Sequence, residues 1–247
     1  MRHAAVVTGG ASGIGLAVAA RLLEDGWPVA VIDADGAALA RAEVEMEQED
    51  AIFLEADITD EEDVADAFDA VVERLGPIGG LVNSAGIARD IPAMETGAEL
   101  FRRILDVNLV GSFICAKAAV ERRSETLSIV NIASVSGLRA NAGRVAYGAS
   151  KAGVKLMSEV MAVELGASGV RVNCIAPGPI DTPMVAQLHG ERDRADWVAR
   201  VPQARYGEPD EVAAAIAVLL SPEAGYVNGH TLAVDGGFMA AGIIRRG

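Results

Sequence analysis

The sequence contains two cysteines, no long apolar run and no repeat or low-complexity tract. Cys115 and Cys174 are far apart and lie in apolar segments. This pattern favours buried, reduced thiols in a cytoplasmic protein over a disulfide framework. No apolar run approaches the roughly 18 residues of a membrane span, and the N-terminus passes directly into a short predicted strand. The sequence therefore predicts neither a membrane span nor a signal peptide.

Basic residues are also scarce. Lys and Arg together number 21 against 35 Asp and Glu, which gives a net charge of −14. Such a chain is a poor partner for nucleic acid or an anionic membrane, because both attract proteins with an excess of positive charge. The three histidines, His3, His189 and His230, are scattered. No His/Cys cluster with the spacing of a metal site is present, so we expect no metal.

The sequence does contain ample apolar residues for one large core, 51% of the chain, in segments that alternate between strand and helix patterns. Strands are predicted at 4–7, 28–32, 51–55, 80–82, 128–132, 170–175 and 226–234. Helices are predicted at 14–25, 37–48, 61–75, 101–120, 147–165 and 208–220. This alternation predicts an α/β fold, a Rossmann-like doubly wound parallel sheet with helices on both faces, in one domain over residues 1–247. Ligands bind at the carboxyl ends of such strands.

A glycine-rich turn connects the first predicted strand to the first helix. Gly9, Gly13 and Gly15 allow a pyrophosphate to approach the backbone, and the helix N-terminus offers free N–H groups and a positive dipole. Asp33 ends the second strand, where a carboxylate can accept hydrogen bonds from ribose hydroxyls and repel a 2′-phosphate. The alternative is that Asp33 and Asp35 merely begin the turn before the next helix.

Tyr147 and Lys151 are four residues apart at the start of a predicted helix, so their side chains share one helical face. A phenol has an ordinary pKa of about 10, too high for a base at neutral pH. A nearby ammonium lowers that pKa, and a tuned Tyr/Lys pair can then exchange a proton with a hydroxyl group. This spacing alone also occurs by chance on many helices. Ser134 follows the predicted strand 128–132.

Thr8-Gly9-Gly10-Ala11-Ser12-Gly13-Ile14-Gly15, Ser134 and Tyr147-Gly148-Ala149-Ser150-Lys151 together resemble the short-chain dehydrogenase/reductase family over nearly the whole chain. The resemblance implies four catalytic residues: Asn108, Ser134, Tyr147 and Lys151. Ser134 would bind the substrate oxygen; Ser136 is the rival, but the 13-residue gap from Ser134 to Tyr147 matches the family. Asn108 would bend its helix and hold a water that connects Lys151 to solvent; the alternative is a core amide with satisfied hydrogen bonds.

The resemblance also implies a dinucleotide site. Its predicted residues are Gly9, Ser12, Gly13, Ile14, Gly15, Asp33, Asp57, Ile58, Asn83, Ala85, Gly86, Tyr147, Lys151, Pro177, Gly178, Ile180 and Thr182. Asp57 would lie near the adenine amino group, although Thr59 or Asp60 close by also suits a helix N-cap. NADP-preferring relatives often carry Arg or Lys where this chain has Ser12 and Ala34, so we expect NAD. Ser84 replaces an Asn that is usual in the family.

These residues together predict an NAD(H)-dependent enzyme that interconverts a secondary alcohol and a ketone by Tyr acid/base catalysis and hydride transfer. We expect a small polar substrate, such as a sugar, polyol or hydroxy acid. Candidate substrate-binding residues are Ser134, Ser136, Leu138, Asn141 and Arg144; Arg144, Arg192 and Arg194 are candidates for binding a carboxylate. The polar segment 183–205 is predicted as a lid over the substrate or, alternatively, as an ordinary pair of surface helices.

Two other functions fit the sequence. One is a reductase of 3-oxoacyl thioesters on acyl carrier protein, whose acidic carrier would need a basic patch; Arg122-Arg123 is the candidate before residue 183. The other is a dinucleotide-binding sensor without turnover. We also expect a homo-oligomer, with a tetramer favoured over a dimer. Its interfaces would be the apolar faces of 101–120 and 152–165 and the strand near 231–234, which would otherwise leave apolar patches exposed.

Overall fold

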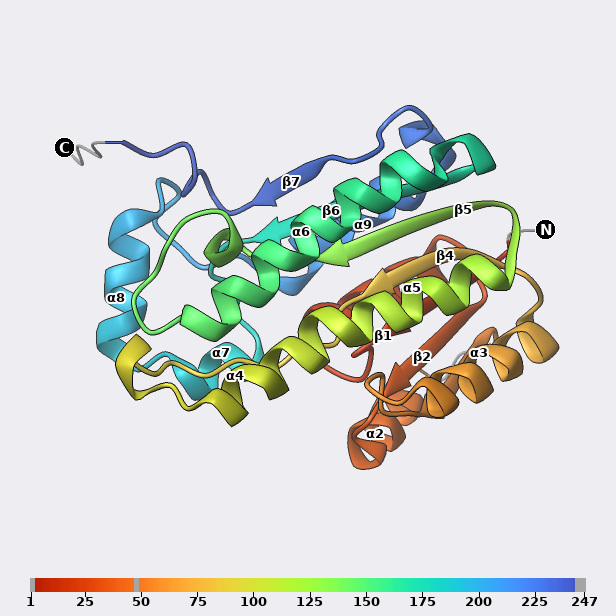
Figure 1. Ribbon diagram of the computed structural model, residues 1–247, viewed down its shortest axis with the longest axis horizontal. Helices are drawn as coiled ribbons and strands as arrows, with labels where there is room; N and C mark the ends of the chain where they lie inside the picture. The colour runs from red at the N-terminus through yellow and green to blue at the C-terminus, as the bar shows by residue number, and fades with distance from the viewer. Residues whose placement is uncertain (1–2, 47–48, 243–247) are drawn as a thin grey trace.

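A seven-stranded, entirely parallel sheet forms the centre of the computed structural model, which describes residues 3–46 and 49–242 (Figure 1). The strand order is β3-β2-β1-β4-β5-β6-β7. The strands are β1 (Ala4–Thr8), β2 (Val29–Asp33), β3 (Ala51–Glu55), β4 (Ile78–Asn83), β5 (Arg123–Ile132), β6 (Val170–Pro177) and β7 (Thr231–Val234). The chain reverses its direction of travel across the sheet between β3 and β4, and β1 and β4 lie side by side at that switch. The predicted doubly wound fold is confirmed.

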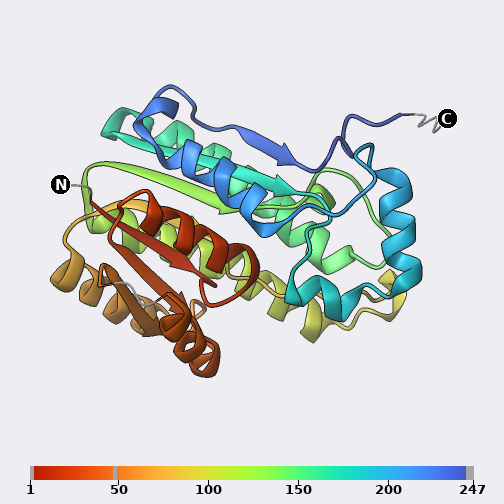
Figure 2. The same ribbon diagram turned by 180° about the vertical axis from the view of Figure 1, so that it is seen from behind.

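Helices cover both faces of this sheet. They are α1 (Gly13–Glu24), α2 (Gly36–Met46), α3 (Glu61–Leu75), α4 (Ala98–Leu105), α5 (Ser112–Glu121), α6 (Val145–Leu165), α7 (Pro183–Leu188), α8 (Glu191–Arg200) and α9 (Pro209–Leu220). Helices α3, α5 and α6 pack on the face seen in Figure 1, and α1, α2 and α9 on the face seen in Figure 2. Successive strand residues point to opposite faces, so Val6 belongs to one core and Val7 to the other.

Local signals account for several helix starts. Pro209 occupies the first turn of α9, where its missing N–H costs no hydrogen bond. Asp60 is the N-cap of α3, and its carboxylate accepts hydrogen bonds from the N–H groups of Glu62 (2.8 Å) and Asp63 (3.2 Å). Asp35 accepts a hydrogen bond from the Ala38 N–H at 3.0 Å. Asp35 thus caps the start of α2 and Asp60 the start of α3.

Several sequence predictions were wrong in extent; the strand predicted at 128–132, for example, begins at Arg123. The segment 101–120 is not one regular helix: a π-helical turn over Asp106–Gly111 separates α4 from α5. The last strand begins at Thr231 rather than at residue 226. Just before it, Gly229 has a φ of +72°, and the Asn228 side chain accepts the Val172 N–H hydrogen bond at 2.8 Å. The Asn228 side chain thus takes the place of a backbone acceptor beside β6, and regular pairing of β6 with β7 starts only at Thr231.

The predicted helix end at Gln48 lies outside the described residues. Both Cys115 and Cys174 are buried and free. Within residues 3–46 and 49–242, every helix is too short or too polar to cross a bilayer.

Candidate active site

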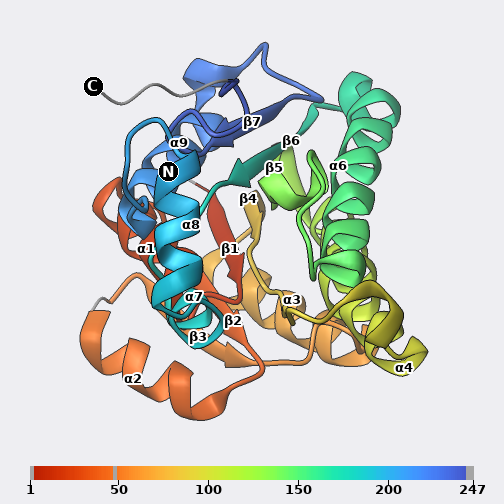
Figure 3. The same ribbon diagram turned by 90° about the vertical axis from the view of Figure 1, so that its left-hand side faces the viewer.

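A cavity of about 320 Å³ opens at the carboxyl ends of the central strands, the end of the sheet that Figure 3 shows with α7 and α8 in front. It is lined by residues that the sequence predicted for a dinucleotide: Gly9, Ser12, Gly13, Ile14, Asp33, Asp57, Ile58, Ala85, Gly86, Tyr147, Lys151 and Thr182. A larger hollow of about 1100 Å³ lies at the amino ends, beside Trp27, Gly79 and Val170. None of the predicted site residues lines that hollow.

The glycine turn provides a backbone surface for phosphate. A Cβ on Gly15 would lie 2.1 Å from the Gly9 carbonyl oxygen, and a Cβ on Gly9 would lie 2.6 Å from the Ala85 Cα. Both glycines are therefore needed for close packing. Gly13 differs: it has a φ of +52°, and the nearest atom to a Cβ there is 3.5 Å away, on Thr182. Ser12, the α1 N-cap, makes no side-chain capping bond, so first-turn donors remain available to a ligand.

Asp33 is held with its carboxylate at the cavity wall. One of its oxygens accepts the Ala11 N–H at 3.2 Å, and the other accepts the Asp35 N–H at 3.1 Å. These two bonds leave lone pairs for further donors such as ribose hydroxyls. Because Asp35 instead caps α2, the two carboxylates have separate tasks, and Asp33 does more than begin a turn.

Asp57 and Arg103 line the same cavity as Asp33. Hydrogen bonds from the backbone and hydroxyl of Thr59, followed by the Arg103 guanidinium, lower the pKa of the Asp57 carboxyl group. The Arg103–Asp57 ion pair measures 3.7 Å. Sequence reasoning missed Arg103, because its position within the α4 pattern is that of an ordinary exposed basic residue.

Thr182 reaches the cavity from the loop after β6. Its hydroxyl oxygen accepts the Val185 N–H at 3.3 Å as the N-cap of α7, which leaves the hydroxyl proton to be donated to a ligand. Five predicted cofactor residues do not line this cavity: Gly15, Asn83, Pro177, Gly178 and Ile180.

Gly178, Ile180 and Asn83 instead make packing or hydrogen-bond contacts within the protein. A Cβ on Gly178 would lie 2.8 Å from the Asp235 Cα, and Ile180 is buried. The Asn83 amide donates to Asn131 Oδ1 at 2.8 Å and to the Ser112 carbonyl at 3.0 Å. Asn83 is therefore one of the buried polar groups that join β4, β5 and the start of α5. Its predicted contact with a cofactor remains a prediction.

Tyr147 lies in the first turn of α6, and Lys151 one turn later, as the sequence predicted. The Lys151 Nζ is 5.8 Å from the centroid of the Tyr147 ring. The Lys151 ammonium is buried and donates to the Ile132 carbonyl at 2.7 Å. Burial lowers the pKa of Lys151 to about 8, since the charged form loses solvation.

The charges that act on Tyr147 include one that the sequence did not predict. Burial raises the pKa of the Tyr147 phenol; the Arg144 guanidinium and a hydrogen bond with Ser134 lower it. The guanidinium carbon of Arg144 lies 5.2 Å from the ring centroid. The effect of the Lys151 charge on this pKa remains a prediction. Lys151 lies beside the ring and is itself weakened as a cation by burial.

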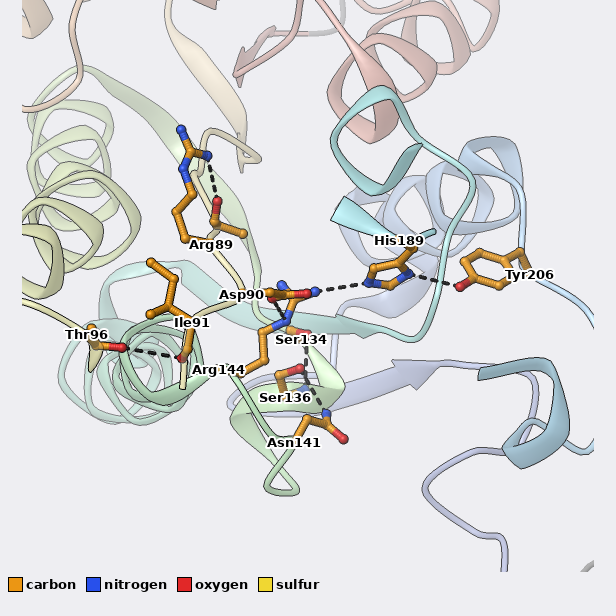
Figure 4. Close-up of polar contacts among 11 residues, drawn as sticks. Arg89, Asp90, Ile91, Thr96, Ser134, Ser136, Asn141, Arg144, His189 and Tyr206 are labelled. Atoms are coloured by element: carbon orange, nitrogen blue, oxygen red, sulfur yellow. Dashed lines mark hydrogen bonds and ion pairs between the residues drawn. The ribbon is translucent and has the colours of Figure 1, made fainter. Parts of the chain in front are cut away.

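The structure separates the two candidate serines (Figure 4). The Ser134 hydroxyl accepts the Ser136 N–H at 3.1 Å, which leaves the Ser134 proton to be donated to Tyr147 or to a substrate. The Ser136 hydroxyl accepts the Asn141 amide at 3.1 Å. Ser136 and Asn141 thus brace the loop, while Ser134 has the free proton beside the phenol.

Asn108 is completely buried in the π-helical turn. Its side-chain oxygen accepts the Ile87 N–H at 2.8 Å, and its amide donates to the Ile87 carbonyl (3.0 Å) and to the Ser150 hydroxyl (3.0 Å). The side chain therefore fixes the loop after β4 to the catalytic helix. The satisfied amide is present, and the helix is interrupted here by the π-helical turn. A role in a proton relay remains a prediction.

Sequence reasoning missed three residues that form a connected series with Arg144, namely Asp90, His189 and Tyr206. Asp90 forms an ion pair with Arg144 at 2.5 Å, and His189 Nε2 lies 3.1 Å from one of its guanidinium nitrogens. Tyr206 in turn contacts His189. Of the other candidate arginines, Arg194 is paired with Asp181 at 2.6 Å. Among the described residues, no group of three or more His, Cys, Asp or Glu side chains is arranged to hold a metal ion.

Comparisons with known proteins agree with this geometry. A family model described as "Enoyl-(Acyl carrier protein) reductase" matches residues 9–239. A cis-4-hydroxycyclohexanecarboxylate dehydrogenase of Sinomonas cyclohexanicum is 42% identical, over 96% of each chain. A galactitol 2-dehydrogenase (L-tagatose-forming) of Cereibacter sphaeroides is 40% identical, over 95% of this chain and 94% of that one.

More distant matches include a 3-oxoacyl-[acyl-carrier-protein] reductase of Thermotoga maritima, 35% identical over 95% of this chain and 96% of that protein. The crystal structure of gox2181 superposes with a TM-score of 0.92 at 34% identity, covering 97% of this chain and 96% of that one. Each of these matches covers at least 94% of both chains, so the similarity extends over nearly the whole protein.

Replacement of each serine separately tests the assignment of Ser134. We expect Ser134→Ala to lower kcat by about 100-fold or more, because it removes a donor from the oxygen on which charge develops. Ser136→Ala is the matched control and should lower kcat by less than about tenfold, since it removes only a loop contact. Steady-state kinetics of the two purified variants provide the measurement. Equal losses, or a larger loss for Ser136→Ala, would contradict the assignment.

Proposed function

The chain belongs to the short-chain dehydrogenase/reductase family, and on this premise we propose that it is an NAD(H)-dependent enzyme that interconverts a secondary alcohol and a ketone. The observation that supports this proposal best is that Tyr147 and Lys151 line a cavity whose backbone turn suits a pyrophosphate, with Ser134 hydrogen-bonded to Tyr147. A protein that only bound a dinucleotide would need no Tyr/Lys pair.

The catalytic side chains have separate tasks in the proposed mechanism. The nicotinamide, when bound, supplies or accepts the hydride. In the oxidative direction Tyr147 Oη, as the phenolate, takes the proton from the substrate hydroxyl. Ser134 donates a hydrogen bond to the substrate oxygen and stabilises the charge that develops there. Lys151 places a positive charge near the Tyr147 ring and, as in the family, would bind the hydroxyls of the nicotinamide ribose. Reduction uses the same groups in reverse, with Tyr147 as the acid.

The preference for NAD rests on the adenosine end of the cavity. Asp33 presents a fixed carboxylate, and neither Ser12 nor Ala34 can neutralise a 2′-phosphate. Arg103 is the basic residue that lines this cavity end, and it is already paired with Asp57. A 2′-phosphate would therefore meet a carboxylate without a compensating cation.

The surroundings of Arg144 favour an uncharged, hydroxyl-rich substrate such as a sugar or polyol. A small cavity of about 160 Å³ beside it is lined by Asp90, Asn141, His189 and Trp197, among others, groups that suit hydroxyl hydrogen bonds and stacking. Arg144 is neutralised by Asp90, so the carboxylate of a hydroxy acid would have to compete with Asp90. The relative from Cereibacter sphaeroides is named for a polyol, which supports the same class, whereas the relative from Sinomonas cyclohexanicum is named for a hydroxy acid.

An acyl-thioester reductase is the second candidate, favoured by the description of the matching family model and by the Thermotoga maritima relative. Its carrier protein is acidic and needs a basic docking patch. Arg122 is paired with Asp69 at 2.6 Å and with Glu121 at 3.6 Å. Arg123 donates to the Val120 carbonyl at 2.7 Å. The expected Arg122-Arg123 patch is thus partly neutralised, and we rank this function second.

We also propose that the protein is a homo-oligomer, with a tetramer favoured, in the cytoplasm. Apolar side chains project from the adjoining helices α5 and α6, which lie along one face in Figure 1. Phe113, Leu156, Val160 and Val163 are all exposed, Val163 at 85%. A second copy that covered this surface would remove it from water. The two free, buried thiols suit a reducing compartment.

A substrate panel tests the reaction. We expect reduced-nicotinamide absorbance to rise when the purified protein meets NAD and secondary alcohols, most strongly for polyols. Tyr147→Phe should lower kcat by at least about 100-fold while NADH binding, followed by its fluorescence, stays nearly unchanged. Reaction with 3-oxoacyl thioesters alone would favour the second candidate. Tight NADH binding without turnover of any alcohol, ketone or thioester would favour a dinucleotide sensor and contradict the proposal.

Cofactor preference tests the role of Asp33. The double change Asp33→Ala with Ala34→Arg should move the ratio of kcat/KM for NADP over NAD upward by roughly tenfold or more, because it removes a repelling charge and adds a charge-assisted donor. Asp35→Asn is the matched control: it keeps the α2 cap, and the ratio should not change. A wild-type protein that prefers NADP would refute the argument from Asp33.

Sedimentation measures the oligomer. We expect the wild-type protein to sediment as a multiple of its 25.5 kDa chain, and Val160→Glu with Val163→Glu to shift it toward the monomer, since each charge would be buried in the contact. Val44→Glu, at an exposed position of α2, should leave the oligomer intact. A monomeric wild-type protein would exclude the interface.

A further inference from the structure

Four polar side chains from distant parts of the chain, Asp90, Arg144, His189 and Tyr206, form one continuous series (Figure 4). Asp90 is ion-paired with Arg144 at 2.5 Å. A guanidinium nitrogen of Arg144 lies 3.1 Å from His189 Nε2. His189 Nδ1 lies 2.9 Å from the Tyr206 hydroxyl. The proposed mechanism uses none of these contacts.

Backbone contacts fix both ends of this series. Residues 90 and 91 are held against the start of α6 by a parallel bridge between Ile91 and Arg144, with the Ile91 N–H donating to the Gly143 carbonyl at 3.0 Å. At the other end, Gly207 follows Tyr206 and is bridged to Ile180 at the exit of β6. His189 lies between the two anchors, directly after α7 within the segment 183–205. Its contact with Arg144 ties this segment to the start of α6.

The hydrogen bonds define the protonation state of His189. A guanidinium can only donate, so Nε2 must accept from Arg144 and carry no proton. The proton is then on Nδ1 and is donated to the Tyr206 oxygen. A protonated imidazole would place a second N–H against the Arg144 N–H and a second positive charge beside the first. The series therefore exists only with neutral His189.

The Arg144 guanidinium also lies over the Tyr147 ring, 5.2 Å from its centroid. Of the charged groups that affect Tyr147, Arg144 has the largest effect, and Asp90 acts in the opposite direction. The position of Arg144 is set by Asp90 on one side and by His189 on the other. A shift of the guanidinium away from the ring would remove positive charge from the place where the phenolate forms.

We propose that Arg144 is a positioning residue for Tyr147, and that neutral His189 holds its guanidinium over the phenol and the segment 183–205 against the catalytic helix. This inference rests on the proposed function in one respect, namely that the Tyr147 phenolate is the catalytic base. Loss of a proton acceptor at His189 releases both Arg144 and the segment. The polar series thus acts as a pH-dependent latch on the substrate side of the site.

The sign of the pH dependence follows from the surroundings of His189. Burial, followed by the Arg144 guanidinium, lowers the pKa of His189 below its ordinary 6.5, so the imidazole charges only when the pH falls through this lowered value. The latch is therefore intact at neutral and alkaline pH and is lost on acidification. The titratable and charged groups around His189 are Asp90, Arg144, Asp181, Asp193, Arg194, Asp196, Arg200 and Tyr206.

Tryptophan fluorescence tests the His189 contact without any turnover. The Trp197 ring stacks on His189 with centroids 6.0 Å apart, and a protonated imidazole quenches a stacked indole. We expect wild-type fluorescence to fall below pH 6.5 and the change to vanish in His189→Gln, whose amide can still accept from Arg144 and donate to Tyr206. Arg144→Lys and Arg144→Gln should raise the midpoint, more strongly in the Gln variant. A midpoint that these changes do not move would overturn the contact.

Titration of the phenol tests the positioning of Arg144. The chain has three tyrosines, and the phenolate absorbance that disappears in Tyr147→Phe belongs to Tyr147. A unit charge about 5 Å away predicts a shift of at least about 0.5 pH unit even in water. Arg144→Gln should raise the Tyr147 midpoint by that amount, whereas Asp90→Asn, a nearly isosteric change, should lower it. Shifts in the same direction, or none, would refute the proposal.

Kinetics in the reductive direction connect the two titrations. Tyr147 is protonated there and acts as an acid, so its own ionisation does not cause a loss of rate on acidification. We expect the wild-type rate to fall with the midpoint seen by fluorescence, and the rate of His189→Gln to stay flat over the same range. An identical acid limb in the two proteins would contradict the latch. If no substrate is turned over, the proposed reaction fails, but the two titrations still decide the inference.

Discussion

Close backbone packing between the glycine turn and the loop after β4 is the constraint on which the rest of the site depends. No Cβ fits at Gly9, because Ala85 is too near, and none fits at Gly15, because the Gly9 carbonyl fills the space. This packing places the turn at the switch point of the sheet, next to the loop that Asn108 binds through both backbone groups of Ile87. Asn108 in turn contacts Ser150 on the catalytic helix. A continuous series of contacts thus runs from the phosphate turn to Tyr147, and neither part is positioned independently of the other.

The electrostatics of the site are local and differ from those of the whole molecule. The chain carries a net charge of −14, yet two cationic side chains, Lys151 and Arg144, lie within 6 Å of the centre of the Tyr147 ring. Lys151 is desolvated, and its ammonium is held by a carbonyl oxygen, so it is a weaker cation than its type suggests. A guanidinium stays charged under conditions where a buried ammonium does not. This difference explains why an arginine can share a task that sequence comparison assigns to the lysine alone.

The sequence predicted those features that nearby residues determine. The strand–glycine turn–helix context, the Tyr147/Lys151 spacing and the order of strands and helices are local patterns, and the structure contains each of them. The π-helical turn at Asp106–Gly111 and the late start of β7 depend on tertiary contacts, of Asn108 with Ile87 and of Asn228 with Val172. The latch depends on the contact of His189 with Arg144, 45 positions away in the sequence, and on its contact with Tyr206, 17 positions away. His189 looked like one of three scattered histidines, because nothing in the neighbouring sequence marks an acceptor for a distant arginine.

The positioning of Arg144 and the nature of the substrate are linked. The Arg144 guanidinium is held through Nε by Asp90 and through one terminal nitrogen by His189. A substrate carboxylate that bound Arg144 would displace Asp90 or draw the guanidinium away from the Tyr147 ring. Binding such a substrate would thus weaken the stabilisation of the phenolate that its oxidation requires. An uncharged alcohol makes no such demand, and its hydroxyls can accept or donate at the rim without breaking the ion pair. On the proposed function, we therefore expect the contacts that hold Arg144 over the Tyr147 ring to disfavour anionic substrates.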